Sequence, residues 1–149
     1  MPQAQDYFEN APTILQPGML ILDIHSPEEV SVSLAGTAAV QAVGELTGSQ
    51  EDAVYSADVR AIMIGRSWTA VNHPCGYIHA RFYRSVEGFK MVSPGMGLPI
   101  RTGNPHLKTL MVFNDVASIG DPVGMADTDG VAQTHGKVSW IDISAGVPD

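Results

Sequence analysis

Residues 19–24 read MLILDI, a short and nearly continuous apolar run that begins directly after the sequence Gln16-Pro17-Gly18. Proline sets φ at the second position of a tight turn, and glycine accepts the positive φ that a type II turn needs at the third. An apolar run of this length, bounded by a turn signal, is typical of a buried β-strand. This stretch therefore predicts that the chain builds its core from strands.

Short segments of the same kind continue along the chain. Residues 30–34 (VSVSL) alternate apolar and polar side chains with a period of two, and similar patterns predict strands at 62–64, 77–83, 89–92, 109–113 and 137–143. Turn signals separate these segments at a spacing close to the about 8–12 residues of sandwiches and barrels. They lie at Gly65, His73-Pro74, Gly88, Pro94-Gly95, Gly103-Asn104-Pro105, Gly120-Asp121-Pro122 and Asp129-Gly130. We predict an all-β fold, mainly β with one or two short helices, in the form of a small barrel or sandwich.

Two segments have helical features. Residues 37–46 (TAAVQAVGEL) place five apolar side chains on one helical face, but Gly44 lies inside the pattern, and a short strand fits equally well. Ser49 can cap a helix, with an acid three residues later, which predicts one or two helical turns around residues 50–58.

The length and composition indicate one folded domain with an N-terminal arm. The chain has 149 residues, of which 44% are hydrophobic and 16% charged, and this length is usual for a single domain. The first dozen residues are polar and contain two prolines, which favours an extended arm over a core element. We predict an extended arm over residues 1–15 and one β-rich domain over residues 16–149. Tyr7 and Phe8 are the candidate anchors of the arm, either on its own domain or on a neighbour.

The net charge of −8 is distributed unevenly. Residues 1–59 contain nine acids and no base, residues 60–114 contain seven bases and one acid, and residues 115–149 contain six acids and one base. The excess of acid argues against nucleic acid and anionic membranes as partners of the whole surface. The segregated charges either neutralise one another within the fold or form complementary faces in an assembly. In the second case Arg60, Arg66, Arg81 and Arg84 are candidates for contacts between subunits or with a partner.

No group of residues predicts a cofactor, a metal site or a catalytic centre. Cys75 is the only cysteine, and we interpret it as a small buried hydrophobic residue. The five histidines lack the spacing of a metal-binding pair. The sequence also lacks an apolar run long enough to span a membrane and the features of a secretory signal. We therefore expect a non-enzymatic protein that binds another protein surface.

Several segments together resemble the head decoration, or cement, proteins of tailed bacteriophages. These are the N-terminal arm, the opening Pro17-Gly18-Met19-Leu20, the stretch AVGEL (residues 42–46), and a C-terminal half with Gly120-Asp121-Pro122-Val123, Asp129-Gly130-Val131 and a closing KVSWIDI. The resemblance implies a virion protein on the outer capsid surface that binds the major capsid protein, assembles as a homotrimer and uses no cofactor. Carried over to this chain, it makes residues 1–15 the capsid-binding arm, with Tyr7 and Phe8 as its anchors.

Two other classes of protein remain open. One is a small β-barrel homo-oligomeric enzyme, such as a hydrolase, with a pocket that brings together at least two of His73, His79, His106 and Asp115. The other is a different virion component, such as a tail or connector protein.

Overall fold

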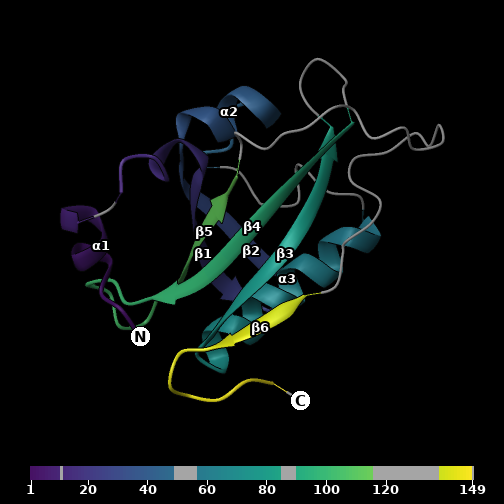
Figure 1. Cartoon of the computed structure of the whole chain (residues 1–149). Helices are drawn as coiled ribbons and strands as arrows, with labels where there is room; N and C mark the ends of the chain where they lie inside the picture. Colours follow the sequence, from purple (N-terminus) through teal and green to yellow (C-terminus); the bar gives the residue numbers. More distant parts are fainter. Residues whose placement is uncertain (11, 49–56, 85–89, 116–137, 149) are drawn as a thin grey trace.

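The computed structural model describes residues 1–10, 12–48, 57–84, 90–115 and 138–148 of the chain. Within these residues, six strands form one antiparallel sheet in the order β2-β1-β5-β4-β3-β6 (Figure 1). The strands are β1 (Met19–Ser26), β2 (Glu29–Ala35), β3 (Cys75–Arg84), β4 (Lys90–Ile100), β5 (Lys108–Asn114) and β6 (Ser139–Asp142). The predicted mainly-β fold is confirmed, and β1 contains the MLILDI stretch.

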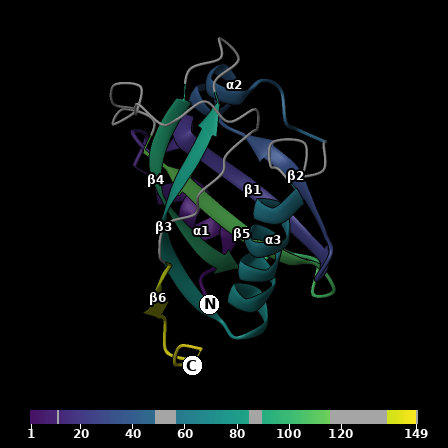
Figure 2. The same ribbon diagram turned by 90° about the vertical axis from the view of Figure 1, so that its right-hand side faces the viewer.

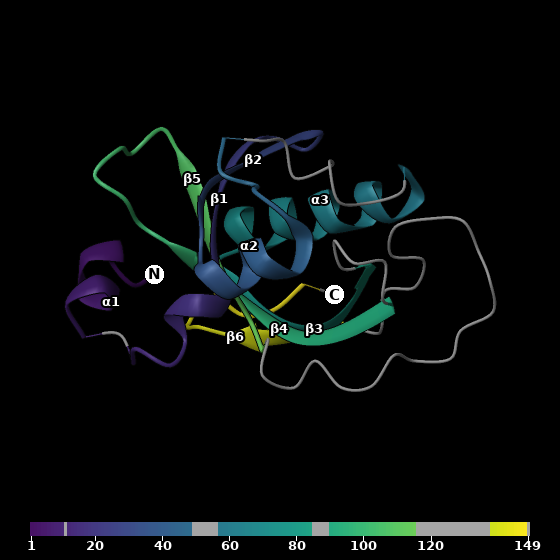
Figure 3. The ribbon, with the colours of Figure 1, turned by 90° about the horizontal axis from the view of Figure 1, so that it is seen from above.

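Four helical segments accompany the sheet in the described part of the chain. They are α1 (Ala4–Asn10), the 3₁₀-helix η1 (Gln16–Gly18), α2 (Thr37–Val43) and α3 (Ala57–Asn72). The last two lie on the same side of the curved sheet, and α1 lies away from them (Figures 2 and 3). α2 confirms the helical alternative for residues 37–46, and it ends where Gly44 adopts a φ of 90°. A φ of this sign favours glycine, because other residues rarely adopt it.

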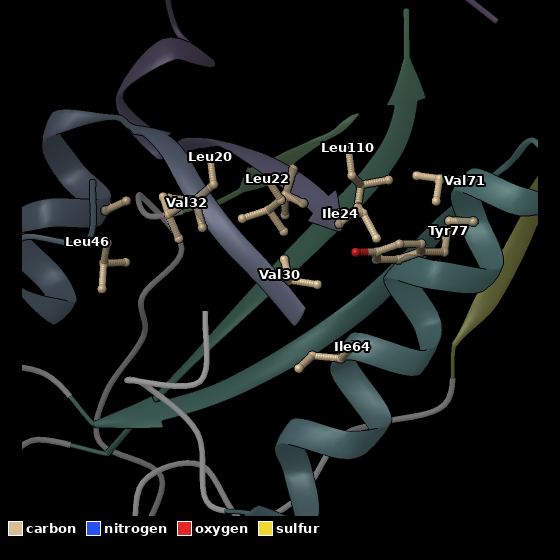
Figure 4. Packing of buried hydrophobic residues seen from close by; sticks show 13 residues of the cluster. Leu20, Leu22, Ile24, Val30, Val32, Leu46, Ile64, Val71, Tyr77 and Leu110 are labelled. Atoms are coloured by element: carbon tan, nitrogen blue, oxygen red, sulfur yellow. The ribbon is translucent and has the colours of Figure 1, made fainter. Parts of the chain in front are cut away.

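The main core lies between the sheet and these two helices, on what we call the helix face. Leu20, Leu22 and Leu110 from the sheet pack with Ile64 and Val71 from α3 (Figure 4). Full burial of a large aliphatic side chain contributes about 1.5–3 kcal/mol of hydrophobic free energy. The strands therefore need α3 to cover this face.

The opposite side of the sheet, which we call the arm face, has a smaller apolar cluster. It contains Met19, Ile21, Ile100, Met111 and Phe113, against which Ala4 of α1 packs. Figure 1 shows β3 and β4 from this side, with α3 behind them. The arm face is thus contacted by the N-terminal segment, whereas α2 and α3 belong to the helix face.

The prediction of a strand at residues 62–64 is wrong, because these residues lie inside α3. Met63 and Ile64 are buried while Ile62 is exposed, and Ala70 and Val71 continue the buried stripe at helical spacing. A three-residue apolar run does not distinguish a strand from one turn of a buried helix. Gly65 is accordingly a helical residue and not a turn, and at 16 residues α3 is longer than the short helices expected.

The turn expected at Pro94-Gly95 is also wrong, since both residues pair with β3 inside strand β4. Proline in a central strand removes a hydrogen-bond donor from the ladder, which is why the sequence favours a turn there. Gly95 has a different role. A Cβ atom at this position would lie 2.9 Å from His79 Nε2 and 3.1 Å from Asn114 Oδ1, so glycine leaves the space that these two side chains occupy.

The arm differs from the extended conformation expected for it. α1 occupies much of residues 1–15, and Gln3 forms a bridge with Arg101 beside it. The helix expected around residues 50–58 falls mostly on residues 49–56, which lie outside the described residues, as do the turns expected at Gly88, Gly120-Asp121-Pro122 and Asp129-Gly130. None of the helices in the described ranges is long and apolar enough to cross a membrane.

Candidate binding surface

The arm is attached to the sheet at its base and exposed along its helix. The amide of Arg101 donates to the carbonyl of Pro2 and the amide of Ala4 donates to the carbonyl of Arg101, both at 2.9 Å. Beyond these bonds, Phe8 is 52% exposed. The side chain of Tyr7, the second expected anchor, lies outside the described part of the structure. The arm therefore presents a large aromatic ring from a fixed point of attachment.

An apolar groove of about 450 Å³ lies on the arm face, and we call it the arm-face groove. Ile78, Met96 and Phe113 stand opposite one another on β3, β4 and β5 and form a row across its floor. Ile14 and Leu15 line it from the end of the arm, and Ile14 is 84% exposed. Because Ile78 is also 49% exposed, the groove offers aliphatic surface from both the arm and the sheet.

The four arginines expected at contacts between subunits lie in different environments. Arg60 is half-buried near the beginning of α3, while Arg81 and Arg84 lie on β3 with side chains outside the described part. Arg66 is only 7% exposed, so it lies in the interior and not on a surface where a partner could reach it. The prediction that Arg66 makes a charge contact at the surface is therefore wrong.

Arg66 is instead part of a buried polar cluster between α3 and β3. Its Nη1 donates to His79 Nδ1 at 2.9 Å and contacts Met63 Sδ at 3.7 Å, and its guanidinium lies 5.9 Å from the centre of the Tyr77 ring. A guanidinium can only donate, so Nδ1 of His79 must accept, and the proton of a neutral imidazole is then on Nε2. Sequence reasoning missed this cluster because its members are far apart along the chain.

Two glycines on β4 make room for that cluster. Gly97 pairs with Tyr77, and a Cβ atom on Gly97 would overlap the tyrosine ring, which lies across the strand. Gly95, two residues before Gly97 on β4, leaves space for the imidazole of His79 in the same way. The only signal in the sequence is a matching alternation, with a Tyr-x-His on one strand and a Gly-x-Gly on the next.

The cysteine has the environment that the sequence predicts. Cys75 is fully buried at the beginning of β3, and burial raises the pKa of its thiol. A raised pKa lowers the fraction of reactive thiolate. This confirms its interpretation as a small buried hydrophobic residue.

The residues of the alternative enzymatic hypothesis are dispersed. His79 contacts Arg66, His73 Nε2 lies near Gly146 of the C-terminal turn, and His106 is exposed between β4 and β5. Asp115 lines the arm-face groove, and none of these three histidines is among the described residues that line it. No three His, Cys, Asp or Glu side chains come together as potential metal ligands within the described ranges.

A second cavity, of about 360 Å³, lies where the arm, α3 and the connection from β4 to β5 meet. We call it the Lys108 pocket. Its walls include Gln3, Val71, Ile100, Arg101, Leu107 and Lys108. It thus combines aliphatic residues with two cationic residues, and Met1 and Gln3 of the N-terminal segment are part of its lining.

The C-terminal turn is organised by one carboxylate. Asp142 Oδ1 accepts hydrogen bonds from the amides of Ser144, Ala145 and Gly146 at 2.8, 3.1 and 2.9 Å. These backbone hydrogen bonds, chiefly from Gly146 and Ser144, lower the pKa of Asp142. The turn follows β6 directly and fixes the chain at the edge of the sheet.

Comparison with known proteins gives no relative: no protein-family model, curated protein or solved structure matches this chain.

Proposed function

We propose that this chain is a structural protein of a tailed-phage head, which binds the outer surface of the major capsid protein lattice as a homotrimer. The observation that carries the proposal is the N-terminal arm, whose base is bonded to Arg101 while Phe8 stays more than half exposed. A helix of seven residues is too short to be stable alone in water. Docking of the arm against another protein surface would stabilise both the helix and the aromatic contact.

The arm-face groove supports the same proposal, in which the arm face is the one that meets the lattice. Ile14 and Leu15, at the end of the arm, line the groove together with Ile78 and Met96, so the arm contributes apolar surface to the groove. We place the coat protein against this surface, since exposed contiguous apolar area marks sites of protein contact. Many identical sites on a capsid, engaged by linked subunits, would give avidity beyond the affinity of one contact.

The experiment is co-sedimentation of the purified chain with expanded heads made from the coat protein of the same phage. Deletion of residues 1–12 should leave a folded protein that no longer associates with heads. Phe8→Ala should weaken the affinity of each site by about tenfold or more, as expected of an aromatic anchor at an interface.

Ile62→Ala is the matched control, because Ile62 is an exposed aliphatic residue on α3, away from the arm face. It should leave association with heads unchanged. Unchanged binding after the deletion of residues 1–12 would overturn the proposal, and so would equal losses from Phe8→Ala and Ile62→Ala. Sedimentation equilibrium of the purified chain tests the trimer separately.

A further inference from the structure

Lys108 lines the Lys108 pocket, and its ammonium group is held by two uncharged groups of α3 that are not among the described lining residues. Lys108 Nζ donates to Asn72 Oδ1 and lies 4.9 Å from the centre of the Trp68 ring, and both of these residues belong to α3. An aromatic face and an amide oxygen attract an ammonium group without neutralising it. The side chain is therefore oriented before any ligand arrives, and its charge remains available.

Arg101 supplies a second cation from the adjacent wall. Its backbone is fixed on both sides by the bonds to Pro2 and Ala4, so the arm determines where the side chain begins. A guanidinium offers several N–H donors in a planar fork that matches a carboxylate. Two residues that line one cavity thus carry a fork-shaped donor and a point charge.

The surroundings of the two cations are apolar or neutral. Val71, Ile100 and Leu107 provide aliphatic surface, and Asp and Glu are absent from the described residues that line the pocket. One carboxylate contacts a lining residue, since Asp23 Oδ1 accepts from Thr109 Oγ1 at 3.3 Å, but Asp23 itself is not part of the wall. In a chain with a net charge of −8, this pocket therefore has two cationic residues and aliphatic residues in its described lining, and no carboxylate.

From these features we infer that the Lys108 pocket binds a carboxylate that carries an apolar group, with Lys108 and Arg101 on the carboxylate and the aliphatic wall on the apolar group. The volume of about 360 Å³ suits a small ligand. Such a carboxylate can come from a free organic acid or from the C-terminus of a polypeptide. This site is distinct from the arm-face groove, and its ligand does not depend on the proposed capsid function.

The arm has a second role in this inference. Gln3 lines the pocket and forms a bridge with Arg101, so the site is complete only when the base of the arm is paired with its own sheet. A ligand that binds the docked state stabilises it by mass action. Carboxylate binding should therefore increase the protection of the Ala4 amide, which donates to Arg101, against hydrogen exchange.

The test is titration of the full chain with benzoate, with a short peptide that ends in leucine, with the same peptide amidated, and with inorganic phosphate. Binding is followed by calorimetry and by the amide NMR signals of Thr102, Asn104 and Lys108. We expect benzoate or the free-acid peptide to bind and to shift these signals, and the amidated peptide to bind at least about tenfold more weakly, because it lacks the charge. The relative affinities of benzoate and the peptide identify the source of the carboxylate.

Two variants of the same residue separate charge from shape. Lys108→Met should weaken binding by about tenfold or more, whereas Lys108→Arg, which keeps the charge over Trp68, should stay within about threefold of the wild type. Arg60→Met removes a cation elsewhere on the chain and should leave the affinity unchanged. The inference is overturned if neither carboxylate binds at 10 mM, if Lys108→Met binds as the wild type does, or if phosphate binds more tightly than both carboxylates.

Discussion

The guanidinium of Arg66 donates to Nδ1 of His79 at 2.9 Å, in an interior where Arg66 is 7% and His79 3% exposed. A buried cation needs hydrogen-bond acceptors, because desolvation of its charge otherwise costs several kcal/mol. This bond joins α3 to β3 and fixes the orientation of the imidazole. The pair is therefore a structural connection between the helix and the sheet.

We predict that Arg66→Ala lowers the free energy of unfolding by about 2–4 kcal/mol, because it removes the partner of His79 and leaves space in the core. Arg66→Met, which fills the space, should cost less. Urea unfolding at pH 7 measures both, with Arg60→Met as the control on the same helix. Equal stabilities of Arg66→Ala and the wild type would contradict this assignment.

The tautomer of His79 provides a second, spectroscopic prediction. Since Nδ1 accepts from Arg66, ¹⁵N NMR of the native protein should show a protonated Nε2 and an unprotonated Nδ1. In Arg66→Met this preference should weaken. A protonated Nδ1 in the wild type would show that the bond to Arg66 is absent in solution.

Gly97 should tolerate no side chain. A Cβ atom there would overlap the ring of Tyr77, which is fully buried. Gly97→Ala should therefore destabilise the protein by about 1–3 kcal/mol or more, as overpacking of a core does. Gly65→Ala is the matched control, because a Cβ atom at this helical position meets nothing within 4 Å, and it should stabilise the protein by about 0.5–1 kcal/mol. Thermal unfolding of the two variants should move the midpoint in opposite directions.

Much of the sheet can be predicted from local patterns alone. The strands β1 and β5 follow apolar runs and are buried along most of their length, and the alternating run of β2 puts Val30 and Val32 in the core, although Leu34 of the same run is exposed. α3 escaped prediction because Ile62, Met63 and Ile64 form a short run next to a glycine. The helical conformation of these residues depends on packing against the helix face of the sheet, which a short apolar run does not reveal.

The candidate site was less predictable for a physical reason. The polar composition of the arm is enough to predict that Phe8 is exposed. The burial of Arg66, by contrast, depends on its hydrogen bond to His79. The Lys108 pocket depends on residues of α3, the arm and the β4–β5 connection that come together only in the fold. Pro94-Gly95 has the composition of a turn, yet Gly95 is required by a side chain on the neighbouring strand. Such long-range requirements leave little trace in a single sequence.

The C-terminal turn should lose its structure in acid. Asp142 has a pKa below its ordinary value of 3.8, because its carboxylate accepts backbone hydrogen bonds in the folded chain. A lowered pKa means that the stabilisation is fully present above the unfolded value and is lost as the pH falls through the folded value. The amide signals of Ser144 and Gly146 should therefore shift, and their protection relative to the intrinsic exchange rate should fall, only below about pH 4. Asp142→Asn keeps an acceptor oxygen without the titrating charge, so its turn should persist with no transition in this range. Asp142→Ala should abolish the turn at every pH. A turn in the wild type that is unchanged at pH 2 would show that the carboxylate does not organise it.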